Sequence, residues 1–152
     1  MSNLMNEFNS KVISAEKAAG LVKSGDLVAY GYFGIPPHDF DIALGNRVDE
    51  LKDVTVHVAG SVRMWQFLKT DPEGKVFTLI SDHFSALDRM LGDKGRAVYG
   101  PVQYHEFHRM RLELQQPFIQ RDVICLTTTP MDSHGNFNFG LCNSDTYAEL
   151  AH

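Results

Sequence analysis

The chain has 152 residues, of which 43% are hydrophobic and 22% charged, and its formal net charge is -5. This size and composition are typical of one globular domain, and the negative charge gives no general electrostatic reason to bind nucleic acid or an anionic membrane. No apolar run approaches the roughly 20 residues of a membrane span, and no secretory signal is evident. Two cysteines make no disulfide framework, so we expect a cytoplasmic protein.

The first part of the chain predicts a helix and then a buried strand. Ser14 can cap a helix through AEKAAGLVK, which Gly25 ends. Residues 26–31, DLVAYG, form a short apolar run bounded by turn residues, as expected of a strand that is buried on both faces. The loop YFGIPPH follows this strand.

The pattern of strand and helix then repeats along the chain. Apolar residues return at helical spacing after Pro37, and VTVHVAG, KVFTLIS, AVYG and DVICLTTT predict four further strands. HFSALDRMLG predicts a helix that Gly92 stops, whereas residues 100–118 fit no single element. The alternation predicts an α/β domain with an open, mostly parallel sheet, helices on both faces, and ligands beyond the carboxyl ends of the strands.

The loop YGYFGIPPH lies between a predicted strand and a predicted helix. Its exposed amides and the positive end of the helix could hold a phosphate, an oxyanion or a carbonyl oxygen. Its only glycines are Gly31 and Gly34, so the dinucleotide fingerprint G-x-G-x-x-G is absent. The structural alternative is a tight turn in which Pro36 and Pro37 merely start the next helix.

The segment YHEFHRMR has two histidines at helical spacing. His105 and His108 would share a helix face, but the zinc-protease pattern needs its second histidine at position 109, which is Arg109. No third ligand is indicated, so we expect no metal site and interpret the segment as polar surface or as a loop at the edge of a substrate site.

The segment LTTTPMDSHGNFNFG, residues 126–140, must turn sharply. Pro130 ends the strand ladder, Asp132 favours a turn through side-chain bonds to backbone, and Gly135 permits a positive φ. Phe137 and Phe139 alternate with asparagines, which predicts a short strand with one apolar face. The structural alternative is an ordinary hairpin.

Four of these segments together carry a family resemblance. KVISAEKAAGLVKSGDLVAYGYFGIPP, RVDELKDVTVHV, YHEFHR and especially DVICLTTTPMDSHGNFNFG resemble the N-terminal domain of the acetyl-CoA hydrolase/transferase family, which includes 4-hydroxybutyrate, acetate and butyrate CoA-transferases. The similarity covers residues 11–152 and leaves residues 1–10 as an N-terminal tail. It implies an open α/β fold of the kind that ribose-phosphate isomerases share.

The resemblance also implies a mechanism. In the family, a glutamate carboxylate attacks an acyl-CoA thioester and forms an acyl-glutamyl anhydride. A glutamyl-CoA thioester follows, and a second carboxylic acid then accepts the coenzyme A from it. The nucleophile belongs to a C-terminal domain and to a glycine-rich motif without a counterpart here, so no glutamate of this chain, Glu106 included, is assigned as catalytic. The ending SDTYAELAH begins with capping residues but reaches the last residue after about two turns, so we expect a domain truncated before its catalytic half.

These expectations define a candidate site. The resemblance implies that the loops 31–37, 104–109 and 130–140 line one wall of an acyl-CoA cleft. The candidate substrate-binding residues are Gly31, Tyr32, Gly34, Pro36, Tyr104, His105, Pro130, Met131, Asp132, His134, Gly135 and Gly140. Coenzyme A is a substrate in this chemistry, and no resident cofactor is expected.

The expected partners are an acyl-CoA, a short-chain carboxylate, the missing C-terminal domain or a partner chain, and further copies in a homo-oligomer. One alternative is a non-catalytic acyl-CoA-binding or assembly domain of the same fold. A complete sugar-phosphate isomerase is a second alternative, which the resemblance to the transferase branch disfavours.

Overall fold

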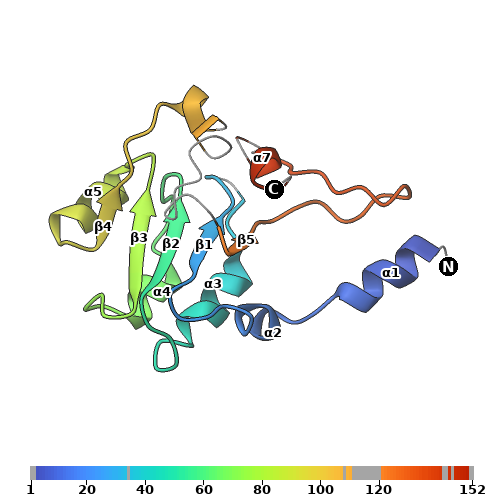
Figure 1. Ribbon diagram of the computed structural model, residues 1–152, viewed down its shortest axis with the longest axis horizontal. Helices are drawn as coiled ribbons and strands as arrows, with labels where there is room; N and C mark the ends of the chain where they lie inside the picture. The colour runs from blue at the N-terminus through green and yellow to red at the C-terminus, as the bar shows by residue number, and fades with distance from the viewer. Residues whose placement is uncertain are drawn as a thin grey trace.

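The structure is a computed structural model that describes residues 3–33, 35–107, 109–110, 121–141, 144 and 146–150. Five strands form one sheet in the order β4-β3-β2-β1-β5, and every pair of neighbours is parallel. The strands are β1 (Leu27–Tyr30), β2 (Val54–Val58), β3 (Phe77–Ser81), β4 (Ala97–Tyr99) and β5 (Val123–Cys125). Figure 1 shows all five arrows pointing the same way. The predicted open, parallel α/β fold is confirmed.

Short helices connect or flank the strands. They are α1 (Asn3–Lys11), α2 (Ala15–Ala19), α3 (His38–Gly45), α4 (Gln66–Thr70), α5 (Ala86–Asp93), the 3-10 turn η1 (Tyr104–Glu106) and α7 (Thr146–Leu150). Ser14 caps α2 as predicted, because its Oγ accepts a hydrogen bond from the Lys17 amide at 3.2 Å. Among the described residues, no helix has the length and apolar character that crossing a bilayer requires.

Three predicted boundaries were wrong. The helix after Ser14 ends at Ala19 rather than continuing, because Gly20 is its C-cap. The helix expected from His83 begins at Ala86, where Ser85 and Asp88 form a reciprocal capping box. The last strand ends at Cys125 because the chain then leaves the sheet.

One face of the sheet carries the hydrophobic core. Residues Val28, Tyr30, Val56 and Leu79 point to this face and are at most 2% exposed. They pack with side chains of α2, α3, α4 and α5 in a single cluster. Burying this apolar surface, at roughly 25 cal/mol per Å², is the main stabilising contribution.

In the part of the chain that the structure describes, residues of the connection between β4 and β5 lie against the face of the sheet opposite the core. His57 and Ile80 point away from the core and line a pocket together with Phe107 and Arg121, which belong to this connection. Because successive right-handed connections from β1 to β4 keep their helices on one face, the return to β5 must use the opposite face. The connections therefore reverse direction between β1 and β5.

Two segments project together from the body of the sheet. Figure 1 shows α1 and residues 126–141 extending to the same side, beyond β5. We call residues 126–141 the arm. No residue of α1 is buried, but Phe8 packs against Phe137 of the arm with ring centroids 5.8 Å apart. The residues expected to be an N-terminal tail thus include a helix that lies against the arm.

Candidate functional site

The loops after β1 and β5 are joined at the point where the strand connections reverse direction. The Gly31 amide donates to the Cys125 carbonyl at 3.0 Å, and the Thr127 amide donates to the Ile35 carbonyl at 3.2 Å. The Thr127 hydroxyl donates to the Pro36 carbonyl at 3.1 Å. Open α/β sheets bind ligands in the crevice at such a reversal, so this junction is the centre of the candidate site.

Gly31 is required at this junction by space. A Cβ at this position would lie 2.8 Å from the Leu126 Cβ and 2.9 Å from atoms of Ile35. These distances are shorter than any ordinary van der Waals contact, so a larger residue would separate the two loops. The glycine that the sequence singled out therefore allows the arm to start directly beside the loop after β1.

An aromatic cluster connects the loop after β1 to the turn η1. Tyr32 is 1% exposed, and its ring lies 6.0 Å from the ring of Phe107 in an edge-on arrangement. Tyr104 contacts Phe107 at 5.9 Å but is itself 63% exposed. Tyr32 and Tyr104 are therefore brought close through Phe107, whereas the side chain of His105 is exposed.

The arm is held by its own hydrogen bonds. Asp132 Oδ1 accepts from the amides of His134 and Asn136, both at 2.8 Å. These bonds, with the one from Asn136 first, hold the pKa of Asp132 below its ordinary value. Gly135 has φ +87°, as predicted. The tip of the arm is thus a preformed turn.

The short strand predicted around Phe137 and Phe139 is absent from the described arm. Across the arm, the Thr129 amide donates to the Asn138 carbonyl and the Asp132 amide donates to the Asn136 carbonyl, each at 2.9 Å. Pro130 follows and cannot donate, so no ladder continues. The arm is a hydrogen-bonded loop, and the exposed fraction of Phe137 is 48%.

The structure therefore brings together some of the predicted site residues and separates others. Gly31, Tyr32, Pro36 and Tyr104 lie around the junction of the loops, with His105 beside them on η1. The members of the arm lie along it beyond the junction: Pro130, Met131, Asp132, His134, Gly135 and Gly140. Gly34 and His108 lie outside the described residues. The arm joins the candidate site at its base rather than at its tip.

A pocket of about 250 Å³ lies against β2, β3 and β4, on the face of the sheet opposite the core. His57 lines it, with Nε2 2.5 Å from Asp82 Oδ2 and Nδ1 2.9 Å from Arg121 Nη2. A guanidinium only donates, so Nδ1 accepts and Nε2 carries the proton toward Asp82. Both ring nitrogens are engaged, so the His57 ring is held in a fixed orientation within a largely apolar pocket.

Two further observations bear on the chemistry of the site. Burial raises the pKa of the Cys125 thiol to about 12, so the thiol stays protonated near neutral pH and is not a nucleophile. Among the described residues, no three His, Cys, Asp or Glu side chains gather as a metal site would require.

Sequence reasoning missed the loop after β2, which belongs to the same edge of the sheet. The Ser61 amide donates to Asp88 Oδ2 at 2.9 Å, and the Ser85 hydroxyl donates to the Ser61 carbonyl at 2.9 Å. The signal was available, because VTVHVAG was predicted as a strand and its loop had to lie at the carboxyl edge.

Gly60 is a second residue of this loop whose identity the structure requires. Its φ is +79°, and a Cβ there would lie 2.6 Å from Cε1 of Phe33.

We expect Gly60→Ala to lower the free energy of unfolding by about 2 kcal/mol, because alanine disfavours the left-handed backbone and its Cβ would displace the Phe33 ring. Urea unfolding measures this loss. Gly95 also has a positive φ but has no atom within 4 Å of such a Cβ, so Gly95→Ala should cost less; an equal loss would show that Phe33 is irrelevant.

Comparisons with known proteins give a consistent result. Residues 1–151 match the profile of the acetyl-CoA hydrolase/transferase N-terminal domain. The chain is 39% identical over 138 residues to a probable butyrate:acetyl-CoA coenzyme A-transferase of Syntrophomonas wolfei, covering 90% of this chain and 30% of that protein. It is 33% identical over 149 residues to the butyryl-CoA:acetate CoA-transferase of Anaerostipes caccae, covering 95% of this chain and 32% of that protein.

Solved structures show the same fold. RipA from Yersinia pestis superposes with a TM-score of 0.84 at 22% identity, over 99% of this chain and 36% of that one. The 4-hydroxybutyrate CoA-transferase of Porphyromonas gingivalis superposes with a TM-score of 0.63 at 17% identity, over 98% of this chain and 33% of that one. The chain thus spans about a third of the length of the proteins that it matches.

Proposed function

The chain belongs to the acetyl-CoA hydrolase/transferase family, within its N-terminal domain, and from this premise we propose that it forms one wall of the acyl-CoA cleft of a cytoplasmic CoA-transferase. The enzyme moves coenzyme A between an acyl-CoA thioester and a short-chain carboxylate, with CoA as a substrate and no resident cofactor. The reaction proceeds through a glutamyl-CoA thioester. The nucleophilic glutamate lies in the part of the relatives beyond the third that this chain matches.

The junction of the loops after β1 and β5 is the observation that carries this proposal. It joins two of the four segments that carry the family resemblance, through the hydrogen bonds of Gly31 and Thr127. Phe107 adds the third segment by packing on Tyr32. The exposed apolar side chains of the arm, including Leu141 at 88%, then face the C-terminal remainder of the enzyme or a further copy in an oligomer.

A non-catalytic acyl-CoA-binding or assembly domain is the second candidate, and under both candidates Glu106 is not the nucleophile. Glu106 Oε2 accepts a hydrogen bond from Arg109 Nε at 2.7 Å. The carboxylate is therefore held in an ion pair rather than presented as a nucleophile. Both candidates share the acyl-CoA wall and differ only in whether a catalytic remainder joins it.

Acyl-CoA binding tests the wall itself. We expect acetyl-CoA to bind weakly in isothermal titration, since only part of the cleft contributes contacts. Thr127→Val should weaken this binding about threefold, because it removes the hydroxyl bond to Pro36 that holds the two loops together.

Thr128→Val is a matched control. The Thr128 hydroxyl donates only to the neighbouring Thr129 carbonyl, at 3.0 Å, so its loss leaves the junction intact and affinity unchanged. Equal affinities for the Thr127→Val and Thr128→Val variants, or no binding of acetyl-CoA by the unchanged chain, would contradict the proposed wall.

A further inference from the structure

The loop after β2 contains an arginine whose hydrogen-bonding capacity is not satisfied by the chain. Nε and Nη2 of Arg63 are buried, and neither atom has a hydrogen-bond partner in the part of the chain that the structure describes. Burying guanidinium N–H groups without acceptors costs free energy, and each such exception in a native fold calls for an explanation.

The neighbours of Arg63 compensate its charge only in part. Its guanidinium carbon lies 5.7 Å from the centre of the Trp65 ring, which is a cation–π contact without a hydrogen bond. Asp41 is close enough to sense the charge, but Asp41 Oδ2 accepts from the Gln66 amide at 2.8 Å instead. Burial raises the pKa of Asp41 despite the opposing effect of Arg63. Asp41 therefore caps α4 and leaves the arginine unpaired.

Residues on both sides hold the loop around Arg63 in place. Ser61 is fixed by its amide bond to Asp88 and by the Ser85 hydroxyl, each at 2.9 Å. Trp65 is fixed because its Nε1 donates to Ser61 Oγ at 2.7 Å. The residues on both sides of Arg63 are therefore fixed, so little entropy is lost in ordering this loop when a ligand binds.

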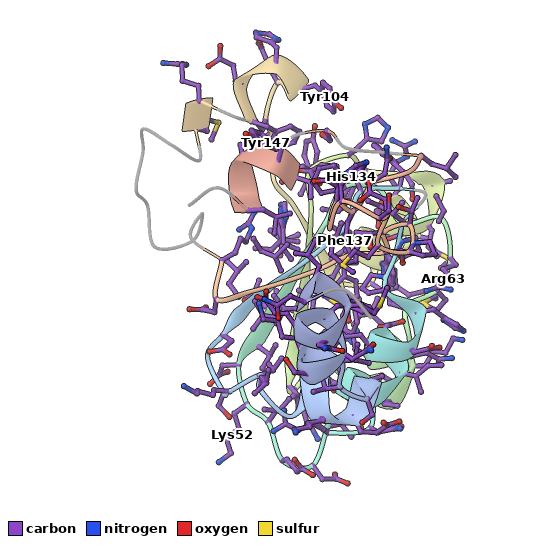
Figure 2. The ribbon with its side chains drawn as sticks, turned by 90° about the vertical axis from the view of Figure 1, so that its right-hand side faces the viewer. Lys52, Arg63, Tyr104, His134, Phe137 and Tyr147 are labelled. Carbon is purple, nitrogen blue, oxygen red and sulfur yellow. The ribbon has the colours of Figure 1, made fainter. Side chains whose placement is uncertain are left out.

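We propose that Arg63 binds an oxyanion, either a carboxylate or a phosphate group, at the carboxyl edge of β2. The guanidinium presents parallel N–H donors that match either anion, and its two buried nitrogens supply donors that the fold leaves unused. Figure 2 shows Arg63 apart from Tyr104 and Tyr147.

This inference rests on the proposed function in one respect, because that function supplies the two molecules from which the anion could come. One source is the carboxylate of the acceptor acid. The other is a phosphate of coenzyme A, which an extended pantetheine chain separates from the thioester. The anion chemistry itself depends on neither, so Arg63 can be tested without any transferase activity.

Trp65 provides the readout, because it is the single tryptophan of the chain and contacts Arg63. Fluorescence of the full chain is titrated with inorganic phosphate, with butyrate and with coenzyme A. We expect a saturable change for at least one of the first two, and Arg63→Met should weaken that binding tenfold or more. The anion affinity of Arg63→Lys should fall between those of the unchanged chain and Arg63→Met, because lysine keeps the positive charge but lacks the parallel N–H donors of the guanidinium.

Arg89→Met is the matched control, since Arg89 is an exposed arginine on α5, and it should respond as the unchanged chain does. A phosphate response identifies the CoA phosphates as the source, and a butyrate response identifies the acceptor carboxylate. No response to either anion, or an equal response in Arg63→Met, would overturn the proposal. A phosphate response without a coenzyme A response would support the anion site and count against the proposed function.

Thermal unfolding separates ligand binding from a structural role. In phosphate-free buffer, Arg63→Met should unfold at the same temperature as the unchanged chain or at a higher one, because an uncompensated buried charge is removed. Added anion should raise the unfolding temperature of the unchanged chain alone. A lower unfolding temperature or failure to fold for Arg63→Met in phosphate-free buffer would show that the arginine supports the fold instead.

Discussion

Mixed with the separately expressed C-terminal remainder of the Anaerostipes caccae relative, the chain is expected to form butyryl-CoA from acetyl-CoA and butyrate, whereas the chain alone forms none above background. The chain matches 32% of that relative, and the proposed function places the nucleophilic glutamate in the remainder. Without a positioned carboxylate there is no covalent acyl intermediate, and one wall of the cleft stabilises ground and transition states about equally. The expected difference in rate is at least about a thousandfold.

Chromatography of the acyl-CoA products measures this difference. Glu106→Gln should leave the activity of the mixture at least partly intact, and Glu73→Gln, which changes an exposed glutamate paired with Lys75, should leave it unchanged. Turnover by the chain alone that Glu106→Gln abolishes would place the nucleophile within this chain. Such a result would refute the proposal that the nucleophilic glutamate lies in the C-terminal remainder.

Replacing Asp88 with alanine is expected to lower the free energy of unfolding by about 3–5 kcal/mol. Asp88 is fully buried, and its Oδ2 accepts hydrogen bonds from the amides of Ser61 and Ser85, each at 2.9 Å. Both donors lose their acceptor in Asp88→Ala, and the loops after β2 and β3 lose the connection that this carboxylate makes between them. Urea unfolding at pH 7 measures the loss. Asp93→Ala, at an exposed carboxylate of the same helix, should stay within about 0.5 kcal/mol.

The effect of Asp88→Ala should also depend on pH. Burial alone raises the pKa of the Asp88 carboxyl, but hydrogen bonds from Ser61 and Ser85 outweigh it, so the pKa in the folded state lies below the ordinary 3.8. A lowered pKa contributes stability fully above the unfolded value and loses it as the pH falls through the folded value. The difference between Asp88→Ala and the unchanged chain should therefore shrink below about pH 3.8. A constant difference would show that packing rather than charge is responsible.

The sheet could be predicted from the sequence because its strands are local apolar runs. VTVHV and FTLIS became β2 and β3 with nearly the expected bounds. Helix ends were predicted less well, because a cap depends on which side chain reaches which amide, as the pair of Ser85 and Asp88 shows. The strand after Asp122 was predicted too long because the backbone of Thr127 bonds to a loop distant in sequence.

The candidate site was predicted only where glycines and turn residues mark it. The positive φ of Gly135 follows from local sequence, whereas Gly31 was noted for its place in the loop after the first strand and its close contact with Leu126 was not predicted. Thr127 and Arg63 could not be identified in this way, because their importance comes from contacts between separate loops. Phe8 likewise packs on Phe137 across most of the chain length, which no periodicity indicates.

The strand order also bears on how the chain folds. Strand β1 pairs with β2, β2 with β3, and β3 with β4, so each of these pairings closes a short loop. Strand β5 must instead return to β1, as the hydrogen bond from the Leu27 amide to the Asp122 carboxylate, 95 residues away in sequence, shows. Loop-closure entropy disfavours such distant pairings early in folding. We therefore expect β5 to dock after the other strands. The junction of Gly31 with Cys125 then forms in the last step, so the proposed acyl-CoA wall is assembled only when the sheet is otherwise complete.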